Sequence, residues 1–215
     1  MLSSTTVFYD VDTQRDFILP GGKLYANGAE KVLPALQSLT RLAREQRIRV
    51  LGSVDKHQPG DRELKRNGGA YDDHCMDGTD GQRKVDETEP LNPLFVPNRE
   101  LTAHQRRAVL EHRGEVIFEK QDFDVFAGNR SADHLLRELL RGCRDLIIYG
   151  VVTEVCVDHA VRGMKKFGVK LHVVTDAIAD IGPHGDKFRQ RWSREGVDLL
   201  TVAELKERLG HKARG

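Results

Sequence analysis

The chain has 215 residues, of which 39% are hydrophobic and 31% are charged, enough for one domain with a substantial core or two small ones. Its 34 basic and 33 acidic residues leave a formal net charge of +1, which favours neither a nucleic-acid partner nor a membrane partner. No apolar run approaches the roughly 20 residues that span a bilayer, the N-terminus lacks a signal-peptide pattern, and three cysteines suit reduced thiols, so we expect a cytoplasmic protein.

Short apolar runs alternate with longer amphipathic segments along the chain. The apolar runs predict six strands, at residues 7–9, 48–54, 116–118, 146–149, 170–174 and 197–202. Apolar residues at helical spacing predict helices at 28–47, 131–142, 154–167, 184–194 and 203–209. Residues 55–105 are rich in Gly, Asp, Asn and Pro, which predicts a long loop, and 211–215 are expected to form a frayed tail.

This alternation predicts a single α/β domain over residues 1–215, with a mostly parallel six-stranded sheet and helices on both faces. Ligands of such sheets bind outside the carboxyl ends of the strands. Four of these strand ends hold residues that can take part in catalysis or bind a metal. They are Asp12, the pair Asp55 and His57, Lys120, and the segment from Gly150 to Cys156.

Cys156 is placed where a buried strand gives way to a helix. The positive end of the helix dipole and its unpaired N–H groups favour a thiolate there, so this position is suited to a nucleophile. Taken alone, the cysteine could be a small core residue and Asp12 a loop cap. Lys120 could be a solvated lysine, and Asp16 could compete for a catalytic role. The occurrence of acid, base and thiol at separate strand ends favours a catalytic site.

Three motifs resemble the isochorismatase-like cysteine hydrolases, and within them the nicotinamidase branch. They are V-D-T-Q-R-D-F from Val11 to Phe17, the strand-end Lys120, and G-V-V-T-E-V-C-V from Gly150 to Val157. The resemblance runs from about residue 7 to 202, in the order that the family pattern expects.

The resemblance implies a role for each residue of these motifs. Asp12 would be the general base, Cys156 the nucleophile, and Lys120 would hold the two in geometry. The family has a cis peptide that falls here at Val151–Val152. It would turn the N–H of Val152 toward that of Cys156 to form an oxyanion hole.

The resemblance also implies a divalent metal in the 55–105 loop. Its ligands would be Asp55, His57 and His74, with Glu63 as the fourth, because many members have a histidine where this chain has Glu63. Asp61 and Asp73 compete as carboxylates for that position. Such ligands suit zinc, which we expect, or iron or manganese.

Aromatic residues of the family's pyridine site have counterparts at Phe17, Tyr71, Phe123 and Phe126, although such rings are more often part of a core. Asp72-Asp73 departs from the proline pair that is common in nicotinamidases. An acidic pair at the rim of the pocket would favour a cationic or polar amide.

We therefore expect a metal-assisted cysteine amidohydrolase that converts nicotinamide into nicotinate and ammonia through a thioester. The small amide is its only expected partner, apart from a possible second copy of the chain in a homo-oligomer. The alternatives within the family are a metal-free amidase or ureide hydrolase, and the isochorismatase reaction, which does not require the cysteine. A non-catalytic ligand-binding α/β module is the alternative from another class, but it needs no thiol in the position of Cys156.

Overall fold

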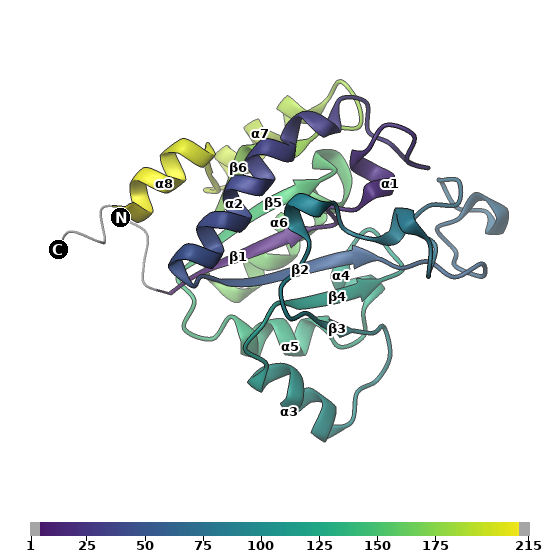
Figure 1. Cartoon of the computed structure of the whole chain (residues 1–215), viewed down its shortest axis with the longest axis horizontal. Coiled ribbons are helices and arrows are strands. Elements are labelled where there is room, and N and C mark those ends of the chain that lie inside the picture. The colour runs from purple at the N-terminus through teal and green to yellow at the C-terminus, as the bar shows by residue number, and fades with distance from the viewer. Residues whose placement is uncertain (1–4, 211–215) are drawn as a thin grey trace.

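The computed structural model describes residues 5–210 and contains one seven-stranded sheet. The strand order is β3-β4-β2-β1-β5-β6-β7, and every neighbouring pair is parallel (Figure 1). The strands are β1 (Thr6–Val11), β2 (Arg49–Asp55), β3 (Leu94–Val96), β4 (Val116–Lys120), β5 (Asp145–Val151), β6 (Lys170–Ala179) and β7 (Asp198–Leu200). The α/β class with a parallel sheet is confirmed. The predicted tail at 211–215 lies outside the described residues.

Two apolar cores lie on opposite faces of the sheet. One face is covered by α1 (Arg15–Ile18), α2 (Leu33–Gln46) and α8 (Val202–Gly210). The other is covered by α3 (Ala103–Glu111), α5 (Ala132–Leu139), α6 (Asp158–Met164) and α7 (Gly185–Arg194). The central strands are buried on both faces, which explains why they appear in the sequence as continuous apolar runs.

The predicted number of six strands is wrong by one. The seventh strand, β3, lies within the segment predicted as a loop, and its three residues stand between Pro93 and Pro97. A run this short shows no periodicity, and prolines confine it to the edge of the sheet. The helix α3 was also missed. Its N-terminus carries a capping box between Thr102 and Gln105, a sequence signal that was available.

The fifth predicted strand, 170–174, is the first half of the longer strand β6. The polar residues Thr175 and Asp176 end the apolar run, but the strand continues to Ala179. Its pairing with β5 shifts register between Ile148 and Gly150. The extension matters because it carries the chain toward the carboxyl end of β5. Among residues 5–210, no helix is long and apolar enough to cross a membrane.

Candidate active site

The carboxyl ends of β1 and β2 are fastened together by the side chain of Gln14. Its amide nitrogen donates to the carbonyl of Asp55 at 2.8 Å, and its amide oxygen accepts from the N–H of Asp55 at 2.7 Å. Directly after β1 the chain turns at Asp12, whose φ of +48° is unusual for a residue other than glycine. The turn places the Asp12 carboxylate in the interior, with no exposed surface.

Lys120 ends β4 and lies at the centre of the buried polar groups. Its Nζ is 2.9 Å from Asp12 Oδ2 and 3.6 Å from Cys156 Sγ, and it forms an ion pair with Asp55 Oδ1. It also donates to the carbonyl of Asp122 at 3.0 Å. Ligand atoms of Asp12, Asp55 and Cys156 lie within 4.8 Å of one another. The structure thus brings together the three residues predicted as catalytic.

Burial sets the protonation of these groups. It raises the pKa of the Cys156 thiol well above its usual value, Asp12 raises that pKa further, and Lys120 only partly opposes the shift. Burial also raises the pKa of Asp12 against the effect of Lys120. Burial alone would lower the pKa of Lys120, but the two carboxylates and the thiol raise it well above the usual value. At neutral pH, Lys120 is therefore a cation and Cys156 a neutral thiol.

The expectation of a depressed pKa at Cys156 is therefore wrong in its net direction, although Lys120 does lower this pKa. The residue lies in a π-helical turn, Thr153–Val157, that precedes α6, and it is 6% exposed. Desolvation of a thiolate at that depth outweighs the dipole of a helix terminus. The peptide Val151–Val152 is cis, as expected from the resemblance.

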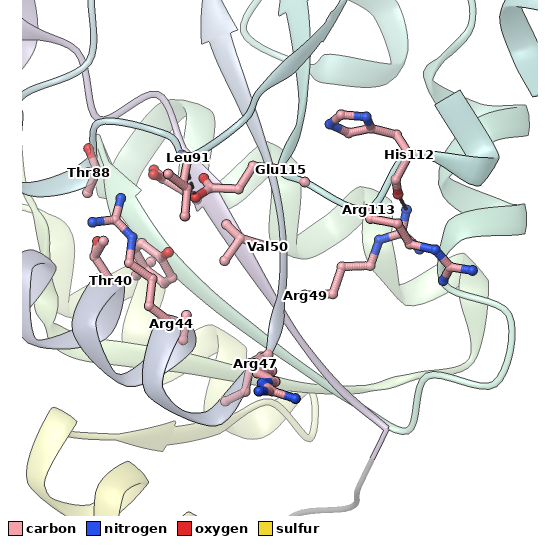
Figure 2. Close-up of a pocket in the computed structure, with 15 residues that line it drawn as sticks. Thr40, Arg44, Arg47, Arg49, Val50, Thr88, Leu91, His112, Arg113 and Glu115 are labelled. Carbon is pink, nitrogen blue, oxygen red and sulfur yellow. Dashed lines mark hydrogen bonds between the residues drawn. The ribbon is translucent and has the colours of Figure 1, made fainter. Parts of the chain in front are cut away.

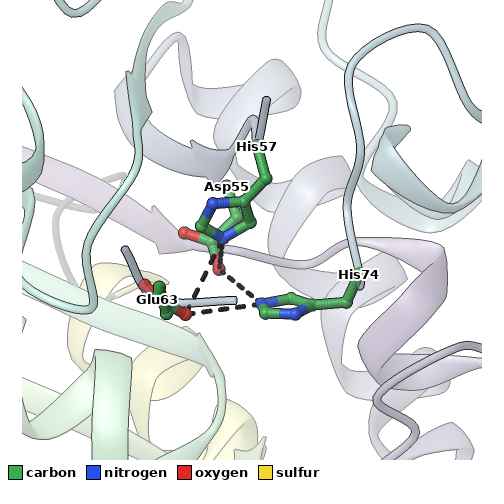
Figure 3. A group of neighbouring side chains, drawn as sticks. All are labelled: Asp55, His57, Glu63 and His74. Atoms are coloured by element: carbon green, nitrogen blue, oxygen red, sulfur yellow. Dashed lines mark ion pairs between the residues drawn. The ribbon is translucent and has the colours of Figure 1, made fainter. Parts of the chain in front are cut away.

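A second group of side chains adjoins Asp55, the cluster formed by Asp55, His57, Glu63 and His74. Figure 3 shows the four side chains converging on one point. His74 Nε2 lies 3.4 Å from Glu63 Oε1 and 3.8 Å from Asp55 Oδ2, and His57 Nε2 lies 3.7 Å and 4.0 Å from the same two atoms. One ligand atom from each residue lies within 4.8 Å of all the others. The structure therefore brings together the four residues predicted as metal ligands.

The far side of each imidazole is already engaged. His57 Nδ1 lies 3.1 Å from Asp61 Oδ2, and His74 Nδ1 lies 2.8 Å from the carbonyl oxygen of Asp72. These contacts leave both Nε2 atoms directed inward and buried. Among residues 5–210, neither they nor Asp55 Oδ2 has a hydrogen-bond partner. Inward Nε2 atoms with Nδ1 fixed by an outer partner are typical of metal-binding histidines. The donor set of two imidazoles and two carboxylates suits a divalent ion.

The two competing carboxylates lie outside the cluster. Asp61 contacts the outer nitrogen of His57, and Asp73 forms an ion pair with Arg66. Asp72 pairs with Lys65 at 2.7 Å. Both members of the Asp72-Asp73 pair are therefore matched by cations, and the rim is not the unbalanced acidic surface that the sequence suggested.

A small pocket opens beside Cys156 and His74. Phe17, Tyr71 and Phe123 line it as predicted. Phe126 does not, because its ring packs against that of Phe167 at 5.9 Å and belongs to the core. Val152, predicted as an oxyanion-hole residue, also lines the pocket, together with three residues that the sequence analysis did not single out, which are Leu24, Val155 and Ile181. The cavity is about 20 Å³, about the volume of one water molecule, so side chains must move to admit an amide.

Ile181 is the most exposed residue of this wall, at 37%, and it follows the end of β6. Its N–H donates to Glu154 Oε2 at 2.9 Å, and the N–H of Gly182 donates to Glu154 Oε1 at 3.1 Å. Thr153 donates from its hydroxyl to the carbonyl of Ala179 at 3.1 Å. The turn that carries Cys156 therefore also holds this wall of the pocket.

Asp16 has a structural role. Its carboxylate accepts the N–H of Cys75 at 2.7 Å and the N–H of Lys23 at 2.9 Å. Both oxygens are thus used by backbone amides, and Asp12 is the aspartate of this turn that faces the thiol.

Comparison with known proteins agrees with this geometry. The family model described as "Isochorismatase domain" matches residues 7–204. A nicotinamidase of Escherichia coli (strain K12) is 24% identical over 221 residues, covering 93% of this chain and 96% of that protein. A pyrazinamidase of Pyrococcus horikoshii, solved in complex with zinc, has a TM-score of 0.71 at 22% identity, covering 92% of this chain and 99% of the other. An N-carbamoylsarcosine amidase of Thermoplasma acidophilum has a TM-score of 0.69 at 23% identity, covering 92% and 96%.

Proposed function

Because this chain belongs to the isochorismatase domain family, we propose that it is an amide-hydrolysing enzyme that converts nicotinamide into nicotinate and ammonia. The observation that carries the proposal is the contact of Lys120 with Asp12, Asp55 and Cys156 beside a cluster of two imidazoles and two carboxylates. The family supplies the reaction class, and the nicotinamidase and pyrazinamidase relatives supply the substrate.

In the first half of the reaction, Asp12 accepts the thiol proton while Cys156 Sγ attacks the amide carbonyl carbon. The raised pKa of Asp12 makes it a stronger base than an exposed carboxylate. As the proton moves to Asp12, negative charge moves from the carboxylate to Cys156 Sγ, and the Lys120 cation, in contact with both groups, stabilises it in either place. The backbone N–H groups of Val152 and Cys156 donate to the oxyanion of the tetrahedral intermediate.

In the second half, Asp12 returns its proton to the leaving nitrogen of the tetrahedral intermediate, the C–N bond breaks, and ammonia departs, which leaves a thioester on Cys156. Water then attacks the thioester carbonyl, with Asp12 taking a proton from it. The C–S bond breaks, the thiol is re-formed with that proton, and nicotinate is released. One amide and one water are consumed for each carboxylate and ammonia formed.

The cluster fits a divalent metal held by Asp55, His57, Glu63 and His74. The test of fit is that Asp55 Oδ2 and both Nε2 atoms are buried without a hydrogen-bond partner among residues 5–210, and that ligand atoms of all four residues lie within 4.8 Å of one another. Zinc is the metal we favour, because it suits mixed imidazole and carboxylate ligands, and iron or manganese would suit them too. When bound, such an ion supplies a Lewis acid beside the substrate.

The pocket residues place the substrate ring. Phe17, Tyr71 and Phe123 present aromatic surface near Cys156, and Tyr71 and Phe123 contact edge to face at 5.7 Å. An aromatic ring packs favourably against such surfaces. Asp72 and Asp73 do not line this pocket and are paired with cations, so they give no reason to expect a cationic amide.

The proposal is tested by ammonia release from a panel of small amides that contains nicotinamide, pyrazinamide and an N-carbamoyl amino acid. We expect nicotinamide or pyrazinamide to give the highest kcat/KM, and Cys156→Ala to release no ammonia from either. A preference for the N-carbamoyl compound would move the assignment to the ureide branch. Turnover by Cys156→Ala would contradict the cysteine mechanism.

A further inference from the structure

A buried lysine that the proposed mechanism does not use lies next to the turn at Asp12. Lys84 is 4% exposed, and it pairs with Gln14 in an isolated antiparallel bridge. The N–H of the next residue, Val85, donates to the carbonyl of Thr13 at 2.9 Å. A buried ammonium group costs free energy unless polar groups surround it. The contacts of Lys84 therefore indicate which part of the chain it holds.

The ammonium group of Lys84 contacts the surroundings of Asp12. Its Nζ lies 3.1 Å from Asp10 Oδ1, and it donates to Thr13 Oγ1 at 3.0 Å and to the carbonyl of Ser53 at 3.4 Å. The same carbonyl accepts the N–H of Asp12 at 3.1 Å. Lys84 thus contacts residues on both sides of Asp12 in the chain, and also the carbonyl to which Asp12 donates.

The hydroxyl of Thr13 joins these contacts into one network. It donates to Asp10 Oδ1 at 2.8 Å, so it accepts from Lys84 and from the hydroxyl of Thr88, which lies 2.7 Å away. Figure 2 shows Thr88 among the residues around a cavity of about 320 Å³, which Asp10 also lines. Lys84 lines neither this cavity nor the pocket beside Cys156, so it does not touch a substrate bound in that pocket.

The turn at Asp12 reverses the direction of its side chain. Successive residues of a strand face opposite sides of the sheet, so regular alternation would direct Asp12 to the face of Asp10, away from that of Val11. Lys120 follows Phe118 by two residues and lies on the face of Val11. The left-handed backbone at Asp12 accompanies its contact with Lys120 on that face. Aspartate adopts this backbone only where its surroundings enforce it.

We propose that Lys84 is a positioning residue for the amide hydrolysis, because with Asp10 and Thr13 it holds the turn that directs Asp12 toward Cys156. This role rests on the proposed function, in which Asp12 accepts the thiol proton. The position of Asp12 can also be followed without turnover. Asp12 raises the pKa of the Cys156 thiol, so a displaced carboxylate changes the pH at which the thiol reacts.

Alkylation of Cys156 by iodoacetamide as a function of pH, in chelator, tests this role in the full chain. Lys84→Met should move the profile to lower pH, as expected of Asp12→Asn, because the carboxylate no longer faces the thiol. Loss of a cation would by charge alone move the profile to higher pH, since a positive charge favours the thiolate. In the Asp12→Asn background, Lys84→Met should add no further shift. A shift to higher pH, or a second full shift in that background, would contradict the role.

Thr13→Val is the second variant, because it keeps the pair of Lys84 and Asp10 and removes the hydroxyl that joins this pair to the turn. It should move the profile in the same direction. It should also fold where Lys84→Met, which leaves a carboxylate buried without its cation, does not. His172→Gln is the matched control, since this buried ring contacts the first residues of β5 and β7 at 3.0 Å, at the other end of the sheet. It should lower Tm and leave the profile unchanged.

Steady-state turnover of nicotinamide gives the second readout. Lys84→Met should lower kcat at least about tenfold and change KM less than about threefold, because the base moves and the ring pocket does not. The positioning role is overturned if Lys84→Met and Thr13→Val lower Tm alone, with the alkylation profile and kcat of the wild type, or if they raise KM alone. A wild-type protein that hydrolyses no amide would reject the proposed function, and the alkylation profiles would still decide whether Lys84 positions Asp12.

Discussion

Lys120 and Asp55 are register partners at the carboxyl ends of β4 and β2, and their side chains form an ion pair there. The pair uses Oδ1 of Asp55 and leaves Oδ2 facing His57 and His74. One carboxylate therefore contacts both the lysine beside the nucleophile and the cluster that we propose to hold a metal. A change in the cluster should alter the surroundings of Cys156 through this residue.

The proposed mechanism predicts strongly non-additive losses at Asp12 and Cys156. Cys156→Ala and Asp12→Asn should each lower kcat by about 10³-fold or more, because the thiol and its base act as one unit. The double variant should be no slower than the slower single variant. Steady-state ammonia release and thermal unfolding measure both points. If the two losses multiplied, Asp12 would have a role other than accepting the thiol proton.

The pKa shifts predict opposite effects of two substitutions on the reactivity of Cys156. Lys120 lowers the pKa of this thiol and Asp12 raises it. In chelator, Lys120→Met should therefore move the alkylation profile to higher pH, and Asp12→Asn should move it to lower pH. The rate of iodoacetamide labelling as a function of pH, followed by peptide mapping, gives the profiles.

Cys143 provides the reference within the same samples. Burial raises its pKa to about 11, and neither Asp12 nor Lys120 is among the groups that shift it. Its profile should stay unchanged in both variants. If the alkylation profile of Cys156 moved in the same direction in both variants, packing and not charge would control the pKa of this thiol.

The geometry of the cluster predicts a graded loss of metal. His57→Ala and Glu63→Gln remove inward-facing atoms and should abolish or strongly reduce metal content. Asp61→Asn disturbs only the outer partner of His57 and should weaken affinity by about tenfold. Asp73→Asn is the matched control, since Asp73 pairs with Arg66, and it should retain full occupancy. Metal analysis after dialysis measures the series, and normal metal content in Glu63→Gln would exclude Glu63 as a ligand.

The contacts of Glu154 predict a role in substrate binding. Glu154→Ala removes both acceptors that hold Ile181 and Gly182, so the wall of the pocket should loosen. We expect KM for the amide to rise by about tenfold and kcat to change less, because two charge-assisted hydrogen bonds are lost at a distance from the reacting atoms. Glu138→Ala on α5, which removes a surface ion pair with Arg141, is the control. If kcat, measured at saturating amide, fell by the same factor as kcat/KM, Glu154 would act in the chemical step instead.

Sequence reasoning found the residues at strand ends because strand ends are local features. Asp12, Lys120 and Cys156 each follow a buried apolar run, and parallel order brings the ends of such runs together. The resemblance to a known family added His74 and Glu63, which lie in a segment with no periodicity of its own. The outer role of Asp61 was not predictable, because it depends on which imidazole nitrogen faces inward.

The contacts that sequence reasoning missed are tertiary. Ile181 reaches the pocket only because β6 continues past Thr175, and no local pattern marks that continuation. Phe126 was placed wrongly because an aromatic residue in the expected motif position can turn either to a pocket or to a core. The pKa of Cys156 depends on its depth, which no local pattern reveals.

Asp16 joins the first turn, residues 12–17, to residues 74–85, so that the two segments form a single unit for protein engineering. Its carboxylate binds the backbone at Cys75, and a β-carbon on Gly81 would come 2.2 Å from the Asp16 carboxyl carbon. The chain also joins these parts through the N–H of Val85, which donates to the carbonyl of Thr13 at 2.9 Å. In a chimaera with residues 74–85 from one relative and 12–17 from another, the carboxylate at position 16 would therefore no longer match the N–H at position 75. Recombination within this family should place its crossovers outside both segments, so that they are inherited together.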